Sequence, residues 1–593
     1  MEKKFRIGLT MAGAVSAGAY TGGVLDYLFQ VMDAWEKAKA EKNPNVPYHE
    51  ISIDIISGAS AGGITGAMAV LDLCSEQRYP MIPTKRNDIE YSKKNVFYHS
   101  WVNLLQDDML PLLLNPSDID RNGKIVSLLN SEFIETVAER AIVCLPHCAT
   151  APPPYVNPQM ELILSLSNLR GFKYNLKFSA EGSSTHSMVQ HRDYAFFRLG
   201  DVYGGDGRIP LNLQKKIGLE ELKQVAPATG AFPIGLAYRK FVRKKKYIIE
   251  NKDLIFYHKG ISEIEEFSEH NLEEDYITFN VDGGMLNNEP FDLTMKLMAK
   301  TSSNNQVANT EELEKQEKDF DATIIMIDPF PSDDSKSITS LKAGAPEELT
   351  KKEKEKIEKF PYDLFEVLMH IYKSLRGEVL FKGEDIVEAF SKSDFSRFMI
   401  APRRRKKINA DGKESEQVLD GSVAIACGAI DGFAGFFDKR FREHDFYLGR
   451  ANCQGFLRKY FRVKLENGKP VNPLFAKGYS LEAIKEYKFQ DEDEKKKYTI
   501  PEDAPWYVPI IPDLFKNDSS FDEKPMDYPK YDLEKFVQQK EAVLKRINLL
   551  GRHLIPTPIL KVLFKLWMFF GKGSLFNKLK GKIGDQFKKW DLL

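Results

Sequence analysis

A serine flanked by glycines is the first candidate for chemistry in this chain. Residues 58–62 (GASAG) form a G-x-S-x-G motif directly after the apolar run 51–57. A serine at a sharp turn from strand to helix exposes its hydroxyl, and the first N–H groups of the helix face the place where an oxyanion develops. The pattern predicts Ser60 as a nucleophile, with Gly58 and Gly62 as the small residues that the turn needs. A turn required only for packing has the same composition.

A second small-residue turn lies near the N-terminus. Residues 13–18 (GAVSAG) follow an apolar run and open a helical segment. Such a turn presents unpaired backbone N–H groups to an anion. We expect the N–H groups of Gly13, Ala14 and Val15, together with that of Ala61, to form an oxyanion hole beside Ser60. A phosphate-binding turn or tight packing is the alternative, but no Walker-type lysine follows the glycines.

The third element is a carboxylate at the end of a predicted strand. Asp282 follows the alternating run Tyr276–Val281 and is followed by two glycines. A carboxylate has a pKa of about 4 and is ordinarily a weak base for an alcohol, but partial burial strengthens it. We therefore predict that Asp282 orients and deprotonates Ser60. On spacing alone, Asp-Gly-Gly is also common in hairpin turns.

Strands and helices alternate in the first third of the chain, which favours a mostly parallel sheet with helices on its faces. Apolar and small-residue periodicity predicts two helices, over Gly18–Ala40 and Ala61–Leu73. The same criteria predict strands over Arg6–Met11, Ile51–Ser57, Met160–Leu166, Phe172–Phe178, Tyr276–Val281 and Ala322–Asp328.

The order of the three elements resembles the patatin-like phospholipase family. Two further segments match its pattern: residues 226–233 (APATGAFP) and the Asn-x-Pro at 288–290. The resemblance spans residues 6 to about 330. It implies a three-layer α/β/α fold, a Ser60–Asp282 dyad without a catalytic histidine, no cofactor, and hydrolysis of acyl esters in glycerolipids by a phospholipase A, lysophospholipase or lipase.

The first loop departs from the family pattern of three glycines, any residue, arginine and glycine. Ala14 and Val15 stand in place of two glycines, and Ala17 stands in place of the arginine. Backbone N–H groups remain available if the φ and ψ angles allow it. A catalytically silent, membrane-associated binding protein of the same fold is therefore one alternative. An acyltransferase, in which an alcohol replaces water at the acyl-enzyme, is another.

Two histidine-containing segments are weaker candidates. His444 lies in a polar and aromatic cluster, residues 442–450, where a structural role is favoured over a catalytic one. Cys144 and Cys148 bracket His147, but no second Cys/His pair stands at ligand spacing. We expect no metal site.

Length and composition predict a large globular chain with insertions. The 593 residues are 42% hydrophobic and 28% charged, and the net charge of −1 gives no basic field for nucleic acid. We expect a catalytic domain over 1–457, with insertions at about 75–155, 301–320 and 331–420, and an extension over 458–593. Residues 301–320 and 403–418 are expected to be solvated loops, although the cations of the second also suit anionic headgroups.

The two termini suggest where the protein works. The start of the chain resembles a secretory signal, but its small polar residues favour a strand followed by a turn. No apolar segment of the sequence reaches the length that a membrane-spanning helix needs. We expect a cytoplasmic protein that touches membranes at their surface. Residues 557–593 predict a basic amphipathic helix that binds the membrane, or else a helix packed on the core. The residues that carry this prediction are Phe576, Leu579, Ile583, Phe587 and Trp590.

Overall fold

The computed structural model describes residues 3–120, 125–132, 134, 151–178, 184–256, 261–300, 320–331, 397–410, 413–524, 526–555 and 557–593. The Cys144–Cys148 segment, the predicted loop at 301–320 except its last residue, and most of the insertion at 331–420 lie outside these residues.

Within the described part of the chain, five parallel strands form the centre of the fold. Their order in the sheet is β10-β9-β1-β2-β3. Strands β1 and β2 are buried along almost their whole length, as expected for a parallel sheet covered on both faces. The N-terminal run is thus a strand of the sheet, as predicted. The bounds are β1 Phe5–Met11, β2 Ile51–Gly58, β3 Val156–Phe178, β9 Ala322–Ile327 and β10 Arg397–Ile400.

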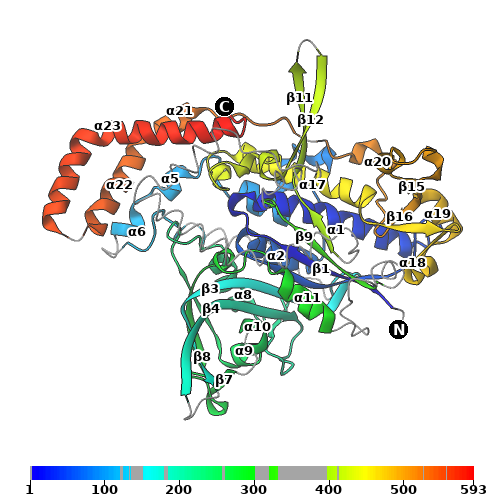
Figure 1. The fold of residues 1–593 in the computed structure, drawn as a ribbon, viewed down its shortest axis with the longest axis horizontal. Coiled ribbons are helices and arrows are strands. Elements are labelled where there is room, and N and C mark those ends of the chain that lie inside the picture. The colour runs from blue at the N-terminus through cyan, green and yellow to red at the C-terminus, as the bar shows by residue number, and fades with distance from the viewer. Residues whose placement is uncertain are drawn as a thin grey trace.

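Helices cover both faces of this sheet (Figure 1). Helices α1 (Gly18–Ala40), α2 (Ser60–Leu73) and α17 (Lys439–Lys459) lie on one side, and α11 (Phe291–Lys300) packs on the other. The alternation of β1 explains this division: Met11 lies against α2 at Gly66, whereas Thr10 bonds Thr294 of α11. The three-layer α/β/α arrangement predicted from the sequence is confirmed.

Strand β3 is longer than the sequence predicts. The two expected strands, Met160–Leu166 and Phe172–Phe178, are parts of one strand, with a shift of register against β4 (Ser184–Leu199) after Ser167. Gly171, with φ of +71°, lies at this irregularity. Because β3 runs on past the parallel strands, β8 (Asp275–Asp282) pairs antiparallel with it, and β6 (Arg239–Lys244) pairs with β8.

The basic segment at 403–418 is not a loop, so that prediction is wrong. Residues Arg403–Ala410 and Lys413–Asp420 form an antiparallel hairpin, β11–β12, which projects from the top of the molecule in Figure 1. Cross-strand ion pairs neutralise part of its charge, between Arg403 and Asp420 at 3.4 Å and between Arg405 and Glu416 at 3.2 Å. A basic segment can thus form a strand when the neighbouring strand carries acidic side chains that pair with it.

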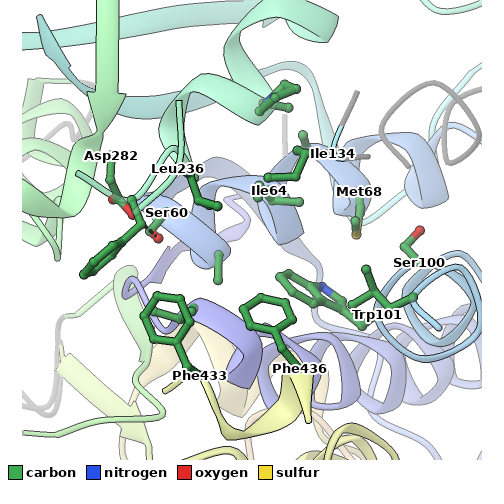
Figure 2. Close-up of a pocket in the computed structure, with 18 of the residues that line it drawn as sticks. Ser60, Ile64, Met68, Ser100, Trp101, Ile134, Leu236, Asp282, Phe433 and Phe436 are labelled. Atoms are coloured by element: carbon green, nitrogen blue, oxygen red, sulfur yellow. Dashed lines mark hydrogen bonds between the residues drawn. The ribbon is translucent and has the colours of Figure 1, made fainter. Parts of the chain in front are cut away.

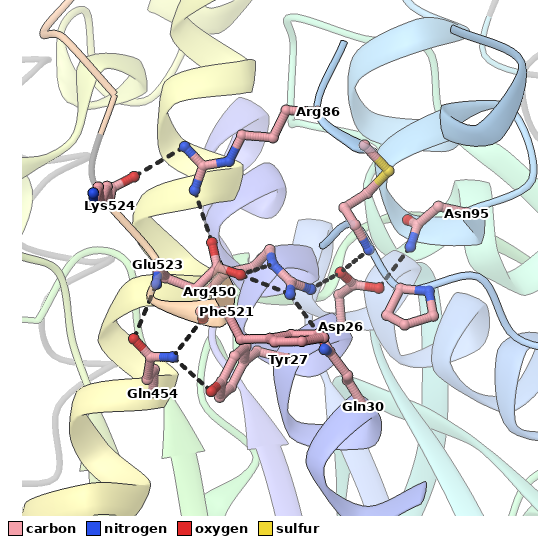
Figure 3. Close-up of polar contacts among 12 residues, drawn as sticks. Asp26, Tyr27, Gln30, Arg86, Asn95, Arg450, Gln454, Phe521, Glu523 and Lys524 are labelled. Atoms are coloured by element: carbon pink, nitrogen blue, oxygen red, sulfur yellow. Dashed lines mark hydrogen bonds and ion pairs between the residues drawn. The ribbon is translucent and has the colours of Figure 1, made fainter. Parts of the chain in front are cut away.

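The C-terminal extension shares the hydrophobic core of the sheet domain, and the predicted boundary at 457 falls in the last turn of α17. A buried polar network holds the two together (Figure 3). The guanidinium of Arg450 in α17 donates to Glu523 at 2.9 Å and to Gln30 at 2.6 Å, and pairs with Asp26 of α1. Breaking a buried pair of this kind typically costs about 3–5 kcal/mol because one charge is left unpaired.

The tail forms a helical pair, α22 (Lys540–Leu554) and α23 (Pro558–Lys589), at the left of Figure 1. The row predicted to face a membrane packs on the body instead: Phe576 is 2% exposed and Phe587 is 0% exposed. Phe576 stacks on Phe536 and Phe587 meets Phe437 edge-on, while Leu579, Ile583 and Trp590 pack partly buried against the same core. The prediction for this face is therefore wrong. Among the described residues, the helices are either too short or too polar to span a bilayer.

Candidate active site

Ser60 occupies a strained turn between β2 and α2. Its φ is +53°, a left-handed conformation that is unfavourable for a residue with a side chain. The turn is tight: a Cβ on Gly62 would lie 2.4 Å from the Met11 carbonyl oxygen, and one on Gly58 would lie 2.6 Å from Gly62. The glycines of the motif are therefore required by close backbone contacts, as the sequence predicts for a nucleophile elbow.

Asp282 reaches Ser60 from the neighbouring part of the sheet. Gly58, at the end of β2, pairs with Leu164 of β3, and Asp282 pairs with Leu166 two residues further along β3. The antiparallel return of β8 thus brings the end of this strand to the end of β2.

The Ser60 hydroxyl donates a hydrogen bond of 2.5 Å to Asp282 Oδ2, and the N–H of Gly284 donates one of 2.7 Å to Oδ1. Both residues are buried, with 5% and 4% exposure. The predicted contact between hydroxyl and carboxylate is present. Among the described residues that line the two cavities at Ser60, there is no histidine.

Thr229, which no sequence pattern singles out, supports the backbone of the serine. Its hydroxyl accepts a hydrogen bond from the backbone N–H of Ser60 at 3.0 Å and donates one to the Ser165 carbonyl oxygen at 2.7 Å. Thr229 is the last residue of α8 (Leu219–Thr229). It lies within the segment 226–233 that matches the family pattern, so the sequence places it near the site without indicating its role.

The loop at residues 13–17 lies beside the serine, with one departure from prediction. The Gly13 N–H donates to the carbonyl oxygen of Asn288 at 3.1 Å, so Gly13 is not an available oxyanion donor in this conformation. Within the described residues, the N–H groups of Ala14, Val15 and Ala61 have no protein acceptor.

Two features of this loop reflect its altered sequence. Val15 has φ of +48°, which a β-branched residue rarely adopts. It stands where the family pattern has a glycine, so the loop keeps the backbone conformation that glycine permits. Ala17, in place of the arginine, is fully buried. The positive charge that the family pattern places here is therefore absent, while position 15 keeps a left-handed backbone conformation.

A small pocket of about 30 Å³ opens between this loop and the dyad. It is large enough for a water-sized group. Its walls contain the three elements identified from the sequence: Gly13, Ala14 and Val15; Ser60; and Asp282, Gly284, Met285 and Asn288, with Phe232 and Pro233.

A larger cavity of about 140 Å³ leads away from the dyad along α2. Figure 2 shows Ser60 and Asp282 at one end and Met68, Ser100 and Trp101 at the other. Ser60, Ile64, Met68 and Leu71 lie on one face of α2, so the cavity follows this helix over about 16 Å. Apart from the dyad and Ser100, its lining is apolar.

Several walls of this cavity come from segments that the sequence marked only as insertions or packing runs. Trp101, Leu105 and Leu113 lie in the insertion at 75–155, and Phe433 and Phe436 precede α17. Trp101 is fixed by a hydrogen bond of 3.1 Å from its indole N–H to Thr65 of α2. The segments that carry these residues show no clear apolar periodicity, so the sequence did not indicate that they line a cavity.

His444 lies away from the dyad and has structural contacts. Its Nδ1 is 2.8 Å from Asp445 Oδ1, and the Asp445 carboxylate accepts from the N–H groups of Ala426 and Cys427, both at 2.8 Å. His444 is 1% exposed and is absent from the lining of both cavities. These contacts fit the structural role expected from the sequence.

Comparison with known proteins agrees with the geometry. The segment 9–295 matches the family described as patatin-like phospholipase. Residues 9–295 belong to the patatin-like phospholipase family. The match contains Ser60, Asp282, the loop at 13–17 and Thr229, and it ends before α11 does.

The chain is also similar to an uncharacterized protein, y4iI, of Sinorhizobium fredii (strain NBRC 101917 / NGR234). The two are 30% identical over 494 residues, which cover 77% of this chain and 65% of the other. The chain thus matches less than two thirds of that relative. The similarity is longer than the patatin-like region, so it also includes part of the chain outside residues 9–295.

Proposed function

We propose that this chain hydrolyses acyl esters of glycerolipids with Ser60 as nucleophile and Asp282 as general base. The observation that carries the proposal is the 2.5 Å hydrogen bond from Ser60 Oγ to Asp282 Oδ2 at the end of an apolar cavity. A hydroxyl within hydrogen-bond reach of a base, held on a strained turn, is the arrangement of an activated nucleophile.

The chemistry follows from these positions. Ser60 Oγ attacks the ester carbonyl carbon while its proton passes to Asp282. The oxyanion of the tetrahedral intermediate accepts hydrogen bonds from the N–H groups of Ala14, Val15 and Ala61. The proton on Asp282 then goes to the leaving alcohol as the C–O bond breaks, which leaves an acyl-Ser60 ester. Water, deprotonated by Asp282, attacks this ester, and Asp282 returns the proton to Ser60 Oγ as the acyl C–O bond breaks and the fatty acid leaves.

The lipid substrate is supported by the shape and polarity of the larger cavity. An acyl chain lying along Ile64 and Met68 would replace water next to apolar walls, and burial of each CH₂ group contributes about 0.8 kcal/mol. The polar part of the lipid would remain on the side of the dyad, where the small pocket at Asn288 offers hydrogen-bonding groups.

Labelling with a fluorophosphonate probe tests the proposal directly. The wild-type chain should be labelled, and Ser60→Ala should abolish both labelling and ester hydrolysis, by more than about a thousandfold. Asp282→Asn should do the same while the far-UV circular dichroism stays unchanged. Ser75→Ala is a matched control, because Ser75 lies just beyond the far end of the same helix, α2. An unlabelled wild-type chain would contradict the proposal.

A silent binding protein of the same fold remains the alternative, supported by the hydrogen bond that engages Gly13 and by the strained Val15. It predicts no labelling but retained binding of a fatty acid in the larger cavity. An acyltransferase would be labelled at Ser60 like a hydrolase. It would differ in transferring the acyl group to an added alcohol in preference to water.

A further inference from the structure

The outer part of the tail exposes large apolar side chains. We call residues 540–570, which are α22 and the first part of α23, the arm; it forms the left end of the molecule in Figure 1. Soluble surfaces carry single apolar residues, but a cluster of this size indicates an interaction site. Its members are between 50% and 71% exposed: Leu554, Leu560, Val562, Leu566, Trp567 and Phe569. Val562, Leu566 and Phe569 share one face of α23, and Leu560 and Trp567, seven residues apart, share another. We call these five residues and Leu554 of α22 the apolar arm surface.

This surface continues an apolar stripe that is buried elsewhere on the same helix. Val562, Leu566 and Phe569 are spaced as residues i, i+4 and i+7 of α23, which lie on one face. Continuing the spacing leads to Phe576 and Phe587, which are 2% and 0% exposed against the body. The stripe is covered where α23 lies on the body and exposed where the helix forms the arm.

The charge around the arm indicates what would cover it. The arm contains six Lys and Arg and one acidic residue, Glu541, and Lys572 follows it on α23, in a chain of net charge −1. Lys545, Lys565 and Lys572 are exposed and have no acidic partner within the described residues. Apolar side chains among exposed cations suit an anionic lipid surface. A second copy of this chain, packed symmetrically here, would place the same cations against each other.

Hydrogen bonds connect the base of the arm to a segment that lines the larger cavity. Arg546 of α22 is buried; it pairs with Asp118 and donates to the carbonyl oxygen of Leu128 at 2.9 Å. The N–H of Leu128 donates to Ile234 at 2.8 Å, two residues before Leu236, which lines the cavity. A surface bound to the arm is thus linked to the cavity at Ser60 through two hydrogen bonds and the short chain segment from Ile234 to Leu236.

We infer that the arm docks on anionic membrane surfaces and brings the Ser60 cavity to the lipid. The docking itself depends only on the arm and the adjoining Lys572. Its purpose, delivery of a hydrolase to its substrate, rests on the proposed function. The experiment therefore measures binding and catalysis separately.

Co-sedimentation of the full chain with vesicles tests docking. Vesicles of phosphatidylcholine mixed with phosphatidylglycerol should pellet the wild-type protein, and pure phosphatidylcholine should pellet much less. Leu566→Glu combined with Trp567→Glu should weaken binding at least tenfold. Lys565→Gln combined with Lys572→Gln should weaken it on anionic vesicles alone, by about fivefold per lysine at low salt. Leu481→Glu is the control, since Leu481 is 74% exposed on α19 (Leu481–Tyr487), outside the arm.

The outcomes separate the two proposals. Ser60→Ala should bind vesicles like the wild type, and the arm variants should keep turnover of a soluble short-chain ester. If the Glu double variant binds anionic vesicles as tightly as the wild type, the docking inference is wrong. It is equally wrong if the wild type is a dimer in light scattering that the double variant converts to a monomer, because the surface would then be a contact between copies.

Discussion

The hydroxyl of Thr229 bridges the nucleophile turn and the central sheet, because it accepts from the Ser60 N–H at 3.0 Å and donates to the Ser165 carbonyl oxygen at 2.7 Å. Ser60 needs this support, since its φ of +53° is strained and its own N–H begins a helix without an intrahelical acceptor. Thr229 acts on the serine through the backbone, so it is a positioning residue.

Replacing Thr229 by valine should therefore lower activity without removing the dyad. The variant leaves the Ser60 N–H and the Ser165 carbonyl oxygen without their partner, and the loss of such a bond is worth about 1 kcal/mol or more. We expect kcat to fall about fivefold to fiftyfold, with KM for a short-chain ester nearly unchanged. Thr229→Ser keeps the hydroxyl and should restore most of kcat. A structural role alone would lower thermal stability in the valine variant but leave kcat per folded molecule intact.

Gly13→Ala should abolish activity by steric displacement. The added Cβ would lie 2.3 Å from Asn288 Oδ1 and 2.9 Å from Ser60 Cβ, so the loop or the serine must move. Movement of the loop would displace the N–H groups of Ala14 and Val15. Loss of one oxyanion donor typically costs a factor of about 100–1,000 in kcat, and we expect an effect of that size in both hydrolysis and fluorophosphonate labelling. Gly455→Ala is the matched control, because a Cβ at Gly455 in α17 meets nothing within 4 Å. Normal labelling of Gly13→Ala would show that the loop does not form the oxyanion hole.

A buried carboxylate on the nucleophile helix should make stability depend on pH. Burial raises the pKa of Asp72 in α2 to about 8; Arg78 opposes the rise, and Asp26 and Asp33 add to it. The folded state therefore holds a proton that the unfolded chain loses near pH 4. The contribution of Asp72 to the free energy of unfolding is therefore fully present below about pH 4. It falls as the pH rises towards 8, by up to about 1.4 kcal/mol per pH unit.

Asp72→Asn should flatten this dependence. The variant cannot ionise, so its melting temperature should exceed that of the wild type at pH 8 and differ less at pH 5. Melting curves across this range would measure the effect. Asp527→Asn removes an exposed carboxylate and should leave the pH dependence of the melting temperature unchanged. If the melting temperatures of Asp72→Asn and the wild type change equally with pH, the pKa of Asp72 is not raised by folding.

The sequence was sufficient for the parts of the fold that have a strong local pattern. The apolar run 51–57, the turn at Ser60 and the helix after it are specified by neighbouring residues, and their positions were predicted within a residue or two. Asp282 was found because a strand end followed by glycines is also a local pattern.

Other features depend on residues distant in sequence. Trp101 and Phe436 line the same cavity, but nothing near either residue indicates this. The tail shows a related limit. The spacing of Phe576 and Phe587 indicated an apolar helix face, but periodicity does not say whether protein or lipid covers it, and the membrane prediction for this face was wrong. The Gly13 N–H donates to Asn288, a contact across the fold that the loop sequence does not reveal.

The far end of the larger cavity should set the acyl-chain length that the protein accepts. Met68 lines this end, two turns along α2 from Ser60, and Figure 2 places it close to Trp101. Met68→Trp adds bulk there, so p-nitrophenyl palmitate and laurate should lose kcat/KM by at least about tenfold, because each excluded CH₂ group forfeits about 0.8 kcal/mol. The butyrate ester, which ends nearer the dyad, should be hydrolysed as before. Met68→Leu conserves volume and should leave the whole series unchanged. A uniform loss across all chain lengths would instead indicate that Met68 only supports the packing of α2, and that the acyl chain lies elsewhere.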